Sequence, residues 1–281
     1  MERGHSAPQA LELLVGSDSQ SGQRQVALID GRGRVAVHTG EGCREWAGEV
    51  RAPGFVVQGN FLAGAEVVDL MAKTFLESHG SLSDRLLLAL AAGEVAGGDG
   101  RGKQSAALLV VKAGGGYLGG NDRLVDLRVD DAPEPVSELR RLYAVHAARN
   151  LPGVHIRLGD QALSAGNRAS AEREYARVIH LYRQAMGRWA EDASLRNGLA
   201  WFYVRRRVNL DEAFRLAQEA LSLDPRSWEV VDTIAEIYYV RGNLPKAREF
   251  AGRALELDPE NAYLASQVAR FENAIQERGM R

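Results

Sequence analysis

The sequence predicts two domains of different fold class: a mixed α+β domain, followed by an all-α repeat solenoid. Residues 1–130 are rich in glycine and carry short strand-like runs between turns, whereas residues 155–277 show helical periodicity and contain few glycines. Two closely similar segments in the second half also end at prolines 34 residues apart, Pro225 and Pro259. We therefore expect one domain over residues 1–149 and another over residues 150–281, with a linker at residues 150–153.

The composition narrows the function classes. With 281 residues and 45% hydrophobic content, the chain is long enough for two cores. Its net charge of -2 argues against nucleic acid and anionic membrane as partners, because both attract a strongly basic surface. No apolar run approaches the roughly 20 residues that span a bilayer, and the polar N-terminus does not resemble a signal peptide. We expect a soluble cytoplasmic protein.

The first half begins with a predicted β-hairpin. Residues 25–30 and 35–39 have strand-like alternation on either side of a glycine-rich turn. Another short strand is expected at residues 54–59. Further along the chain, residues 105–111 form an apolar run typical of a buried strand, and residues 124–129 alternate as a half-buried strand.

Helices are expected between and after these strands. Residues 65–77 have apolar side chains at helical spacing. Ser81 can cap a second helix that places Leu82, Leu86 and Leu90 on one face. A third helix follows the prolines near residue 135. Hairpins together with a helical pair predict an antiparallel sheet covered by helices.

The second half contains an internal repeat. The segment EALSLDP at residues 219–225 recurs as RALELDP at residues 253–259, and a period of about 34 residues is typical of the tetratricopeptide repeat, a pair of antiparallel helices. Residues 227–259 resemble the consensus of that repeat best, and residues 194–225 resemble it with one extra residue in the turn. The matching positions in the best copy are Ile234, Ala235, Tyr238, Gly242, Ala247, Ala254 and Pro259.

A weaker copy precedes these two, with Leu158 and Gly159 at consensus positions, and residues 261–276 are expected to form a capping helix. The resemblance thus implies about three repeats whose first helices line a concave surface suited to protein or peptide partners. The candidate peptide-binding residues are Asn197, Trp201, Arg205, Glu229, Asp232, Glu236 and Tyr239. Packing of Trp201 between repeats is the alternative. The absence of lysine at these positions argues against a basic clamp for carboxylates.

A glycine-rich stretch, GGDGRGK at residues 97–103, nearly matches a phosphate-binding loop. However, Gln104 stands where that motif needs a magnesium-binding serine or threonine. The helical stretch also lies before the loop, whereas a phosphate-binding loop opens a helix. The sequence therefore argues against a nucleotide site, and it predicts no cofactor.

Residues 24–146 resemble the family known as domain of unknown function 1028. The matching segments are HTG at 38–40, WAG at 46–48, VQGN at 57–60, LAG at 62–64, AGGDGRGKQSAALLV at 96–110, NDR at 121–123 and DLRVDDAPEPVSELRRL at 126–142. That family is assigned to the N-terminal-nucleophile (Ntn) hydrolase superfamily. The resemblance implies a four-layer α-β-β-α sandwich, here partial, and hydrolysis of amide bonds.

The resemblance also implies a pocket at one end of the sheet. The candidate pocket residues are Asn60, Asp99, Arg101, Gln104, Ser105 and Asp122. Asn60 is placed to donate to an oxyanion, and Asp122 and the pair Asp130-Asp131 are expected at the same end of the sheet. The alternative is that these are structural turn residues with no ligand.

One departure from the family pattern is serious. An Ntn hydrolase uses the α-amino group of its first mature residue as base and that residue's side chain as nucleophile. The start of this chain, Met1-Glu2-Arg3, matches nothing in the family's opening, so we expect the nucleophile and part of the sheet to be lost by truncation. A second copy in a homo-oligomer, or a partner, would then complete the sheet, because unpaired edges are unfavourable.

Two functions follow from these observations. The first is an Ntn-type amidohydrolase, inactive as this chain, with repeats that recruit a partner. The second is a non-catalytic scaffold that binds peptides through the repeats. Cys43, with His38 five residues before it, is expected to be a half-buried thiol, because no third group completes a catalytic or metal site.

Overall fold

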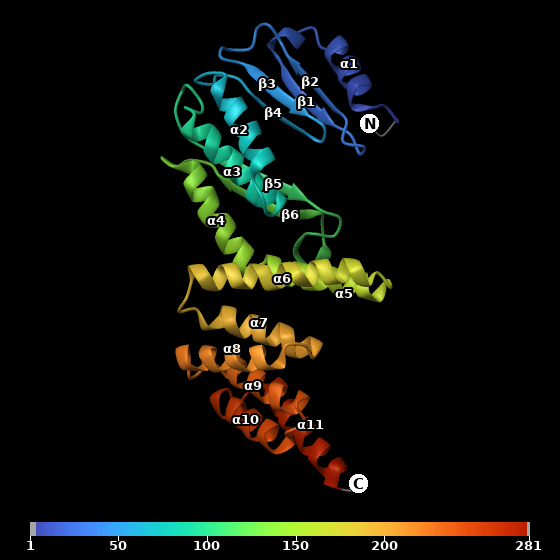
Figure 1. The fold of residues 1–281 in the computed structure, drawn as a ribbon, viewed down its shortest axis with the longest axis vertical. Coiled ribbons are helices and arrows are strands. Elements are labelled where there is room, and N and C mark those ends of the chain that lie inside the picture. The colour runs from blue at the N-terminus through green and yellow to red at the C-terminus, as the bar shows by residue number, and fades with distance from the viewer. Residues whose placement is uncertain (1–3, 280–281) are drawn as a thin grey trace. The chain divides into compact units, whose positions relative to one another are not determined.

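The computed structural model describes residues 4–279, and the chain divides into two compact units between Tyr143 and Ala144. This boundary lies inside helix α4 (Pro135–Arg149). The first unit is mixed α+β and the second is all helical, as expected (Figure 1). The first unit contains α1 (Ala7–Ser17), β1 (Gln25–Ile29), β2 (Val35–Thr39), β3 (Gly48–Ala52), β4 (Phe55–Gly59), α2 (Glu66–Glu77), α3 (Leu82–Val95), β5 (Ala106–Val111) and β6 (Arg123–Val129).

The hairpin predicted at residues 25–39 is confirmed. Strands β1 and β2 pair in antiparallel register, with Gln25 opposite Thr39. Asp30 holds the turn, because its carboxylate accepts hydrogen bonds from the backbone N–H groups of Arg32 and Arg34 at 2.9 and 3.1 Å. An aspartate that binds the backbone two residues on is a common device for turning a chain.

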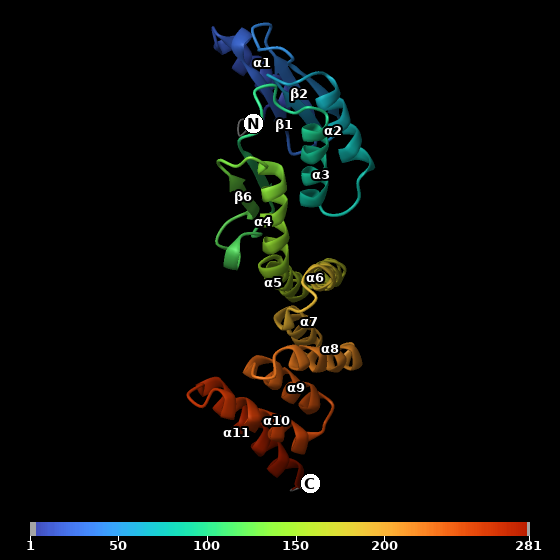
Figure 2. The same cartoon turned by 90° about the vertical axis from the view of Figure 1, so that its left-hand side faces the viewer.

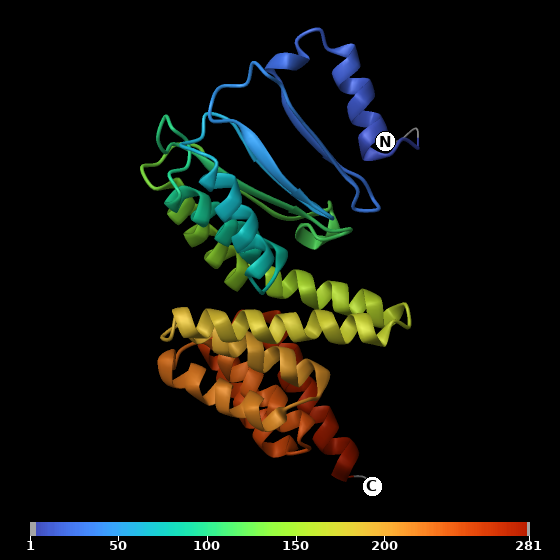
Figure 3. The same cartoon turned by 45° about the horizontal axis from the view of Figure 1, so that its top comes forward.

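Helix α1 covers one face of this hairpin (Figure 3). It starts with a capping box, in which Ser6 accepts from the N–H of Gln9 and the Gln9 side chain accepts from Ser6. Ala7 and Leu11 of the helix are buried together with Ala36 of β2. The other face of the hairpin carries Ala27, which points away from α1 by strand alternation.

Strand β4 confirms the strand expected at residues 54–59, and it pairs with β3, which sequence periodicity did not indicate. The two strands form an antiparallel hairpin with Gly48 opposite Gly59 and a turn of only Pro53 and Gly54. Strand β3 has the sequence GEVRA, in which a single valine is the only large apolar residue. Its charged and small residues have low strand propensity, so the sequence alone did not indicate a strand here.

Strands β5 and β6 form a third antiparallel pair, as the alternation predicted for β6 suggested. The expectation of a fully buried strand at residues 105–111 was wrong. Leu108 and Val110 are buried, but Leu109 and Val111 are 57% and 65% exposed. Only one face of β5 is covered, so an unbroken apolar run here coexists with an exposed face.

Helices α2 and α3 form an antiparallel pair at the positions expected. Ser81 and Asp84 make the predicted cap of α3 into a full capping box. Leu82, expected on the buried face, is 50% exposed because it occupies the first turn, and the buried positions include Leu87 and Ala89. Gly93 lets the helices approach, since a Cβ there would lie 2.6 Å from the sulfur of Met71.

The second unit is a series of antiparallel helix pairs followed by a single helix, which confirms the repeat architecture (Figure 2). Its core is continuous through neighbouring pairs and includes Leu199, Tyr203, Ala217 and Ile234. The small residues at repeat positions are buried where the helices cross. The helices after α4 are α5 (Leu151–Ser164), α6 (Arg168–Arg188), α7 (Ala193–Arg206), α8 (Leu210–Leu223), α9 (Trp228–Val240), α10 (Leu244–Leu257) and α11 (Ala262–Gly279).

The extra residue predicted in the middle repeat lies in the turn between α7 and α8. In the other two repeats the turn uses a glycine in the left-handed conformation, Gly166 (φ 76°) or Gly242 (φ 77°), and one residue separates it from the next helix. In the middle repeat Arg207 (φ 53°) takes the left-handed position, and two residues, Val208 and Asn209, separate it from α8. An arginine in this conformation is strained.

The segment expected to be a linker is mostly helical. Residues 151–153 form the first turn of α5, and only Asn150 separates this helix from α4. Pro152 is compatible with this helix because it lies in the first turn, where a backbone N–H would have no carbonyl partner within the helix. Among residues 4–279, no helix is both long and apolar enough to cross a bilayer.

Candidate functional site

The glycine-rich stretch forms a loop that packs against the segment after β4. The N–H of Gly100 donates to the carbonyl of Phe61 at 2.6 Å, and the N–H of Ala63 donates to the carbonyl of Gly98 at 2.9 Å. A side chain at Gly100 would place its Cβ 3.2 Å from the carbonyl oxygen of Phe61. The glycines thus allow two backbones to approach closely. Phe61 itself is held at φ 56°, which is unfavourable for an aromatic residue.

The backbone donors of this loop are used inside the protein, so the loop does not form a phosphate cradle. The N–H groups of Gly97 and Gly98 donate to the end of α3, and that of Gly102 donates to the carbonyl of Asp99. The N–H of Arg101 donates to the Asp99 carboxylate at 2.9 Å. A phosphate site needs several such N–H groups free and aimed at one point. The structure therefore supports the sequence argument against a nucleotide.

Asp99 and Arg101, two of the predicted pocket residues, bind each other. The guanidinium reaches the carboxylate through Nε at 2.9 Å and Nη2 at 2.6 Å, and it lies over the Phe61 ring at 4.3 Å. The hydrogen bonds from Arg101 lower the pKa of Asp99. Both groups face solvent in part, so this pair orders the loop more than it stabilises the fold.

Asn60, another predicted pocket residue, belongs to a polar network centred on Gln25. The Asn60 amide donates to the Gln25 side-chain oxygen at 3.0 Å. The Gln25 Nε2 atom lies 2.9 Å from the Gly59 carbonyl and 3.2 Å from both the Gly48 carbonyl and the Thr39 hydroxyl. One amide therefore joins strands β1 to β4 at their common end.

The network continues through Thr39, whose hydroxyl donates to the Glu49 carboxylate at 2.5 Å. Gln25, Thr39 and Glu49 were not predicted as site residues. A glutamine at the start of a strand carries no motif, and its role follows only from how the two hairpins pack.

The remaining predicted pocket residues do not join this cluster. Gln104 and Ser105 are exposed and lead into β5, where the Gln104 carbonyl accepts from the N–H of Ala132 at 2.9 Å. Asp122 lies at the opposite end of the β5–β6 pair, and its carboxylate accepts from the N–H of Gly114 at 2.8 Å. The expectation that Asp122 and Asp130-Asp131 share one end was wrong, because the seven-residue strand β6 separates them by about 20 Å.

Cys43 is a half-buried thiol, as expected. His38 is engaged elsewhere, with its Nε2 atom 2.9 Å from the carbonyl oxygen of Ser21. Within residues 4–279, no group of three or more His, Cys, Asp or Glu side chains has a geometry that would hold a metal ion.

The predicted peptide-binding residues lie along two first helices of the repeats. Asn197, Trp201 and Arg205 are on α7; Trp201 is half-buried, and the exposed Arg205 lies 5.6 Å from its ring. The Oδ1 atom of Asn197 is buried and has no hydrogen-bond partner. A buried acceptor without a donor is unfavourable, but this atom is shielded from solvent and does not belong to the open surface of α7.

On α9, helix α11 covers most of the predicted residues. Asp232 and Glu236 are 3% and 6% exposed. The Tyr263 hydroxyl donates to Asp232 at 3.0 Å, and Arg270 pairs with Glu236. Of the other two predicted positions on α9, Tyr239 stacks on the Phe271 ring of α11, whereas Glu229 is exposed.

Burial makes the Asp232 carboxyl a weaker acid than an ordinary aspartate. It raises the pKa of this carboxyl to about 6, with the neighbouring Glu236 acting in the same direction and the Tyr263 hydroxyl opposing it. The expectation that the α9 residues face an open concave surface was therefore wrong for Asp232 and Glu236. The capping helix, whose sequence was recognised, packs over them.

Comparison with known proteins identifies both units. Residues 1–139 match the model of a family of unknown function, DUF1028, and residues 209–271 match a tetratricopeptide repeat model. No protein of curated function matches the chain.

Similar solved structures divide in the same way. A DUF1028 protein from Silicibacter pomeroyi is 30% identical, with a TM-score of 0.47; the match covers 53% of this chain and 63% of that one, so the chain spans less than two thirds of it. A tetratricopeptide protein from Thermus thermophilus is 21% identical over 49% of this chain and 71% of that one, with a TM-score of 0.41. The second tetratricopeptide domain of human RPAP3, solved with an HSP70 peptide, is 18% identical over 43% and 98%, with a TM-score of 0.33.

Proposed function

We propose that this chain, in which residues 1–139 form a DUF1028 domain and a tetratricopeptide repeat segment follows, is an interaction protein that binds a partner peptide along α7 of its repeats. The observation that carries the proposal is the pair of Trp201 and Arg205 on α7. Like Glu229 of α9, these predicted surface residues are left uncovered by α11, and the exposed Arg205 lies beside the half-buried Trp201.

The chemistry of this group suits an extended peptide. The indole of Trp201 offers a rigid apolar surface, and the guanidinium of Arg205 beside it can bind a carbonyl or carboxylate. Such a combination of an aromatic anchor and adjacent polar groups is typical of the energetic centre of an interface.

For the first unit we propose a non-catalytic role in this chain. The resemblance implies amide hydrolysis by an N-terminal nucleophile, but the polar groups at the strand ends are bound to one another. Asp99 holds Arg101, and Asn60 holds Gln25. These contacts support a structural role for the loop cluster.

The peptide-binding proposal is tested with an array of random 12-residue peptides probed with the full chain. We expect bound sequences, and we expect Trp201→Ala and Arg205→Ala each to weaken binding of the selected peptides by about tenfold or more. Arg253→Ala is the matched control, because Arg253 is an exposed arginine over an aromatic ring, Phe250, but on the second helix of its repeat. Equal losses for Arg205→Ala and Arg253→Ala, or an array with no bound peptide, would refute the proposal.

A further inference from the structure

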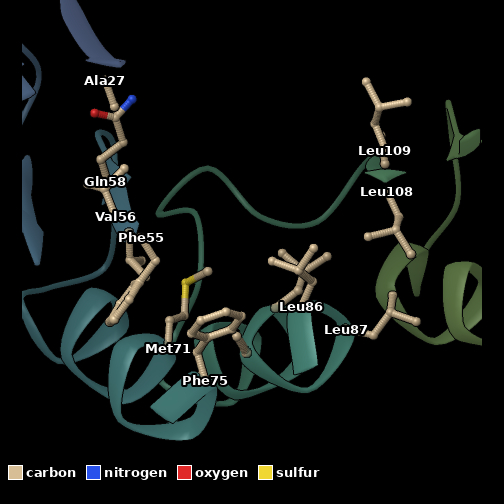
Figure 4. A pocket seen from close by; sticks show the side chains of 14 residues that line it. Ala27, Phe55, Val56, Gln58, Met71, Phe75, Leu86, Leu87, Leu108 and Leu109 are labelled. Atoms are coloured by element: carbon tan, nitrogen blue, oxygen red, sulfur yellow. The ribbon is translucent and has the colours of Figure 1, made fainter. Parts of the chain in front are cut away.

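The first unit contains an apolar cavity of about 450 Å³ between strands β4 and β5 (Figure 4). Residues 55–58 of β4 form one wall and residues 107–109 of β5 form another. Helices α2 and α3 form the floor, with Met71, Phe75 and Leu86 directed into the cavity. Phe55 of the wall and Phe75 of the floor have ring centroids 5.0 Å apart.

The walls of this cavity are strand edges. Side chains of consecutive residues in a strand point to opposite faces, so a cavity lined by several consecutive residues abuts the edge of the strand. Both β4 and β5 line the cavity with consecutive residues. Within residues 4–279, β4 pairs only with β3, and β5 pairs only with β6. The edges that face the cavity therefore have no ladder partner.

The floor and walls favour an apolar occupant with backbone hydrogen-bonding groups. The floor consists of apolar side chains, of which Met71, Phe75 and Leu86 are half-buried. The Gln58 Oε1 atom in the wall is buried and lacks a hydrogen-bond donor. A strand placed between two unpaired strand edges on opposite sides of an apolar floor would supply N–H and C=O groups to both edges and apolar side chains to the floor.

We propose that an extended segment of another polypeptide, with alternating apolar and polar side chains, inserts between β4 and β5 as a β-strand. Its apolar side chains lie on α2 and α3, and its backbone pairs with both edges. This site is separate from the peptide-binding surface of the repeats. A second copy of this chain is not the occupant we favour, because every strand within its residues 4–279 already has a hairpin partner.

The test uses a fluorescein-labelled octapeptide of three Thr-Val pairs flanked by lysines, titrated with the full chain and followed by fluorescence anisotropy. The matched probe is the same octapeptide with N-methyl groups on its three valines, which removes the donors toward one edge and keeps the apolar side chains. We expect the unmodified peptide to bind at least tenfold more tightly than the methylated one.

Two variants test whether the octapeptide binds in the cavity. Leu86→Lys puts a charge into the floor and is expected to weaken binding of the unmodified octapeptide at least tenfold. Leu88→Lys is the control, because Leu88 lies on the same helix, is 39% exposed and is outside the cavity. Circular dichroism of both variants checks that they fold. The comparison of the two peptides on the unsubstituted chain does not depend on either variant.

Three outcomes would overturn the inference. If neither peptide binds, the edges do not accept a strand. Equal affinity for both peptides would mean that the cavity recognises apolar side chains alone. Finally, a chain that sediments as a dimer and becomes monomeric with Leu86→Lys would mean that a second copy fills the cavity.

Discussion

The roles of single residues were predictable where the residues belong to a motif, and not where the role depends on how distant segments pack together. Asn60, Asp99 and Arg101 were identified from family motifs; in the structure Asp99 binds Arg101, and Asn60 binds Gln25. Gln25, which ties four strands together, has no motif and was missed. Asp232 and Glu236 were expected on an open surface and are buried instead, because a position within a repeat does not say whether the next helix covers it.

The buried Asp232 makes the stability of the second unit depend on pH. Its folded pKa of about 6 lies above the ordinary value for aspartate, so the folded state holds the proton more tightly. The resulting stability is present below pH 4 and is lost as the pH rises through 6. A shift of about two pKa units corresponds to about 3 kcal/mol at most.

We therefore expect Asp232→Asn, which mimics the protonated side chain, to gain stability relative to the unsubstituted chain between pH 4 and pH 7. Urea unfolding followed by tryptophan fluorescence measures this, because Trp189, Trp201 and Trp228 lie in the second unit. The control is Glu249→Gln, an exposed carboxylate on α10. A difference between Asp232→Asn and the unsubstituted chain that stays constant over this pH range would contradict the assignment.

Helices and strands were predictable when the segment with periodic apolar residues was long enough to give a clear pattern. All ten helices inferred from apolar spacing, or from the repeat period, are present within residues 4–279, whereas β3 was missed because five residues with one valine carry little pattern. The burial of β5 was overestimated for a related reason. An apolar run indicates a strand, but the presence of a covering layer on each face is a tertiary property.

The turns between repeat helices give a prediction at this scale. Arg207 occupies a left-handed position that glycine fills in the other repeats, so Arg207→Gly should relieve backbone strain and stabilise the second unit by about 0.5–1 kcal/mol. The reciprocal change, Gly242→Ala, should destabilise it by about 1 kcal/mol. Urea midpoints of the two variants measure both effects. Opposite signs are expected, and a loss of stability in Arg207→Gly would show that the arginine side chain makes a larger contribution than the strain costs.

For the whole molecule, the order of a mixed α+β unit and a repeat unit followed from composition and period alone. The sheet arrangement did not. The resemblance implies a four-layer sandwich, and the described chain contains three separate two-stranded pairs instead of extended sheets. Strand pairing depends on contacts between segments that are distant in sequence, and local patterns do not record them.

A prediction about amide hydrolysis also belongs to this scale, because it concerns the whole chain. We expect the 281-residue chain to release no product from small amide or peptide substrates, because the polar groups at the strand ends are bound to one another: Asp99 to Arg101 and Asn60 to Gln25. A panel of chromogenic amides, assayed with the purified full chain and a catalytic amidase as positive control, measures this. Turnover above the buffer blank that persists through repurification would refute the expectation.

The pairing of each strand with its nearest neighbour in sequence has a consequence for how fast the first unit forms. The connections that must close are five residues between β1 and β2, two between β3 and β4, and eleven between β5 and β6. Short loops cost little entropy to close, and hairpins form in roughly 1–10 μs. Each ladder can therefore form before any contact between hairpins exists. Docking of the hairpins onto α1, α2 and α3 then becomes the slow step of folding, and the Gln25 amide makes its contacts to β3 and β4 only in that step.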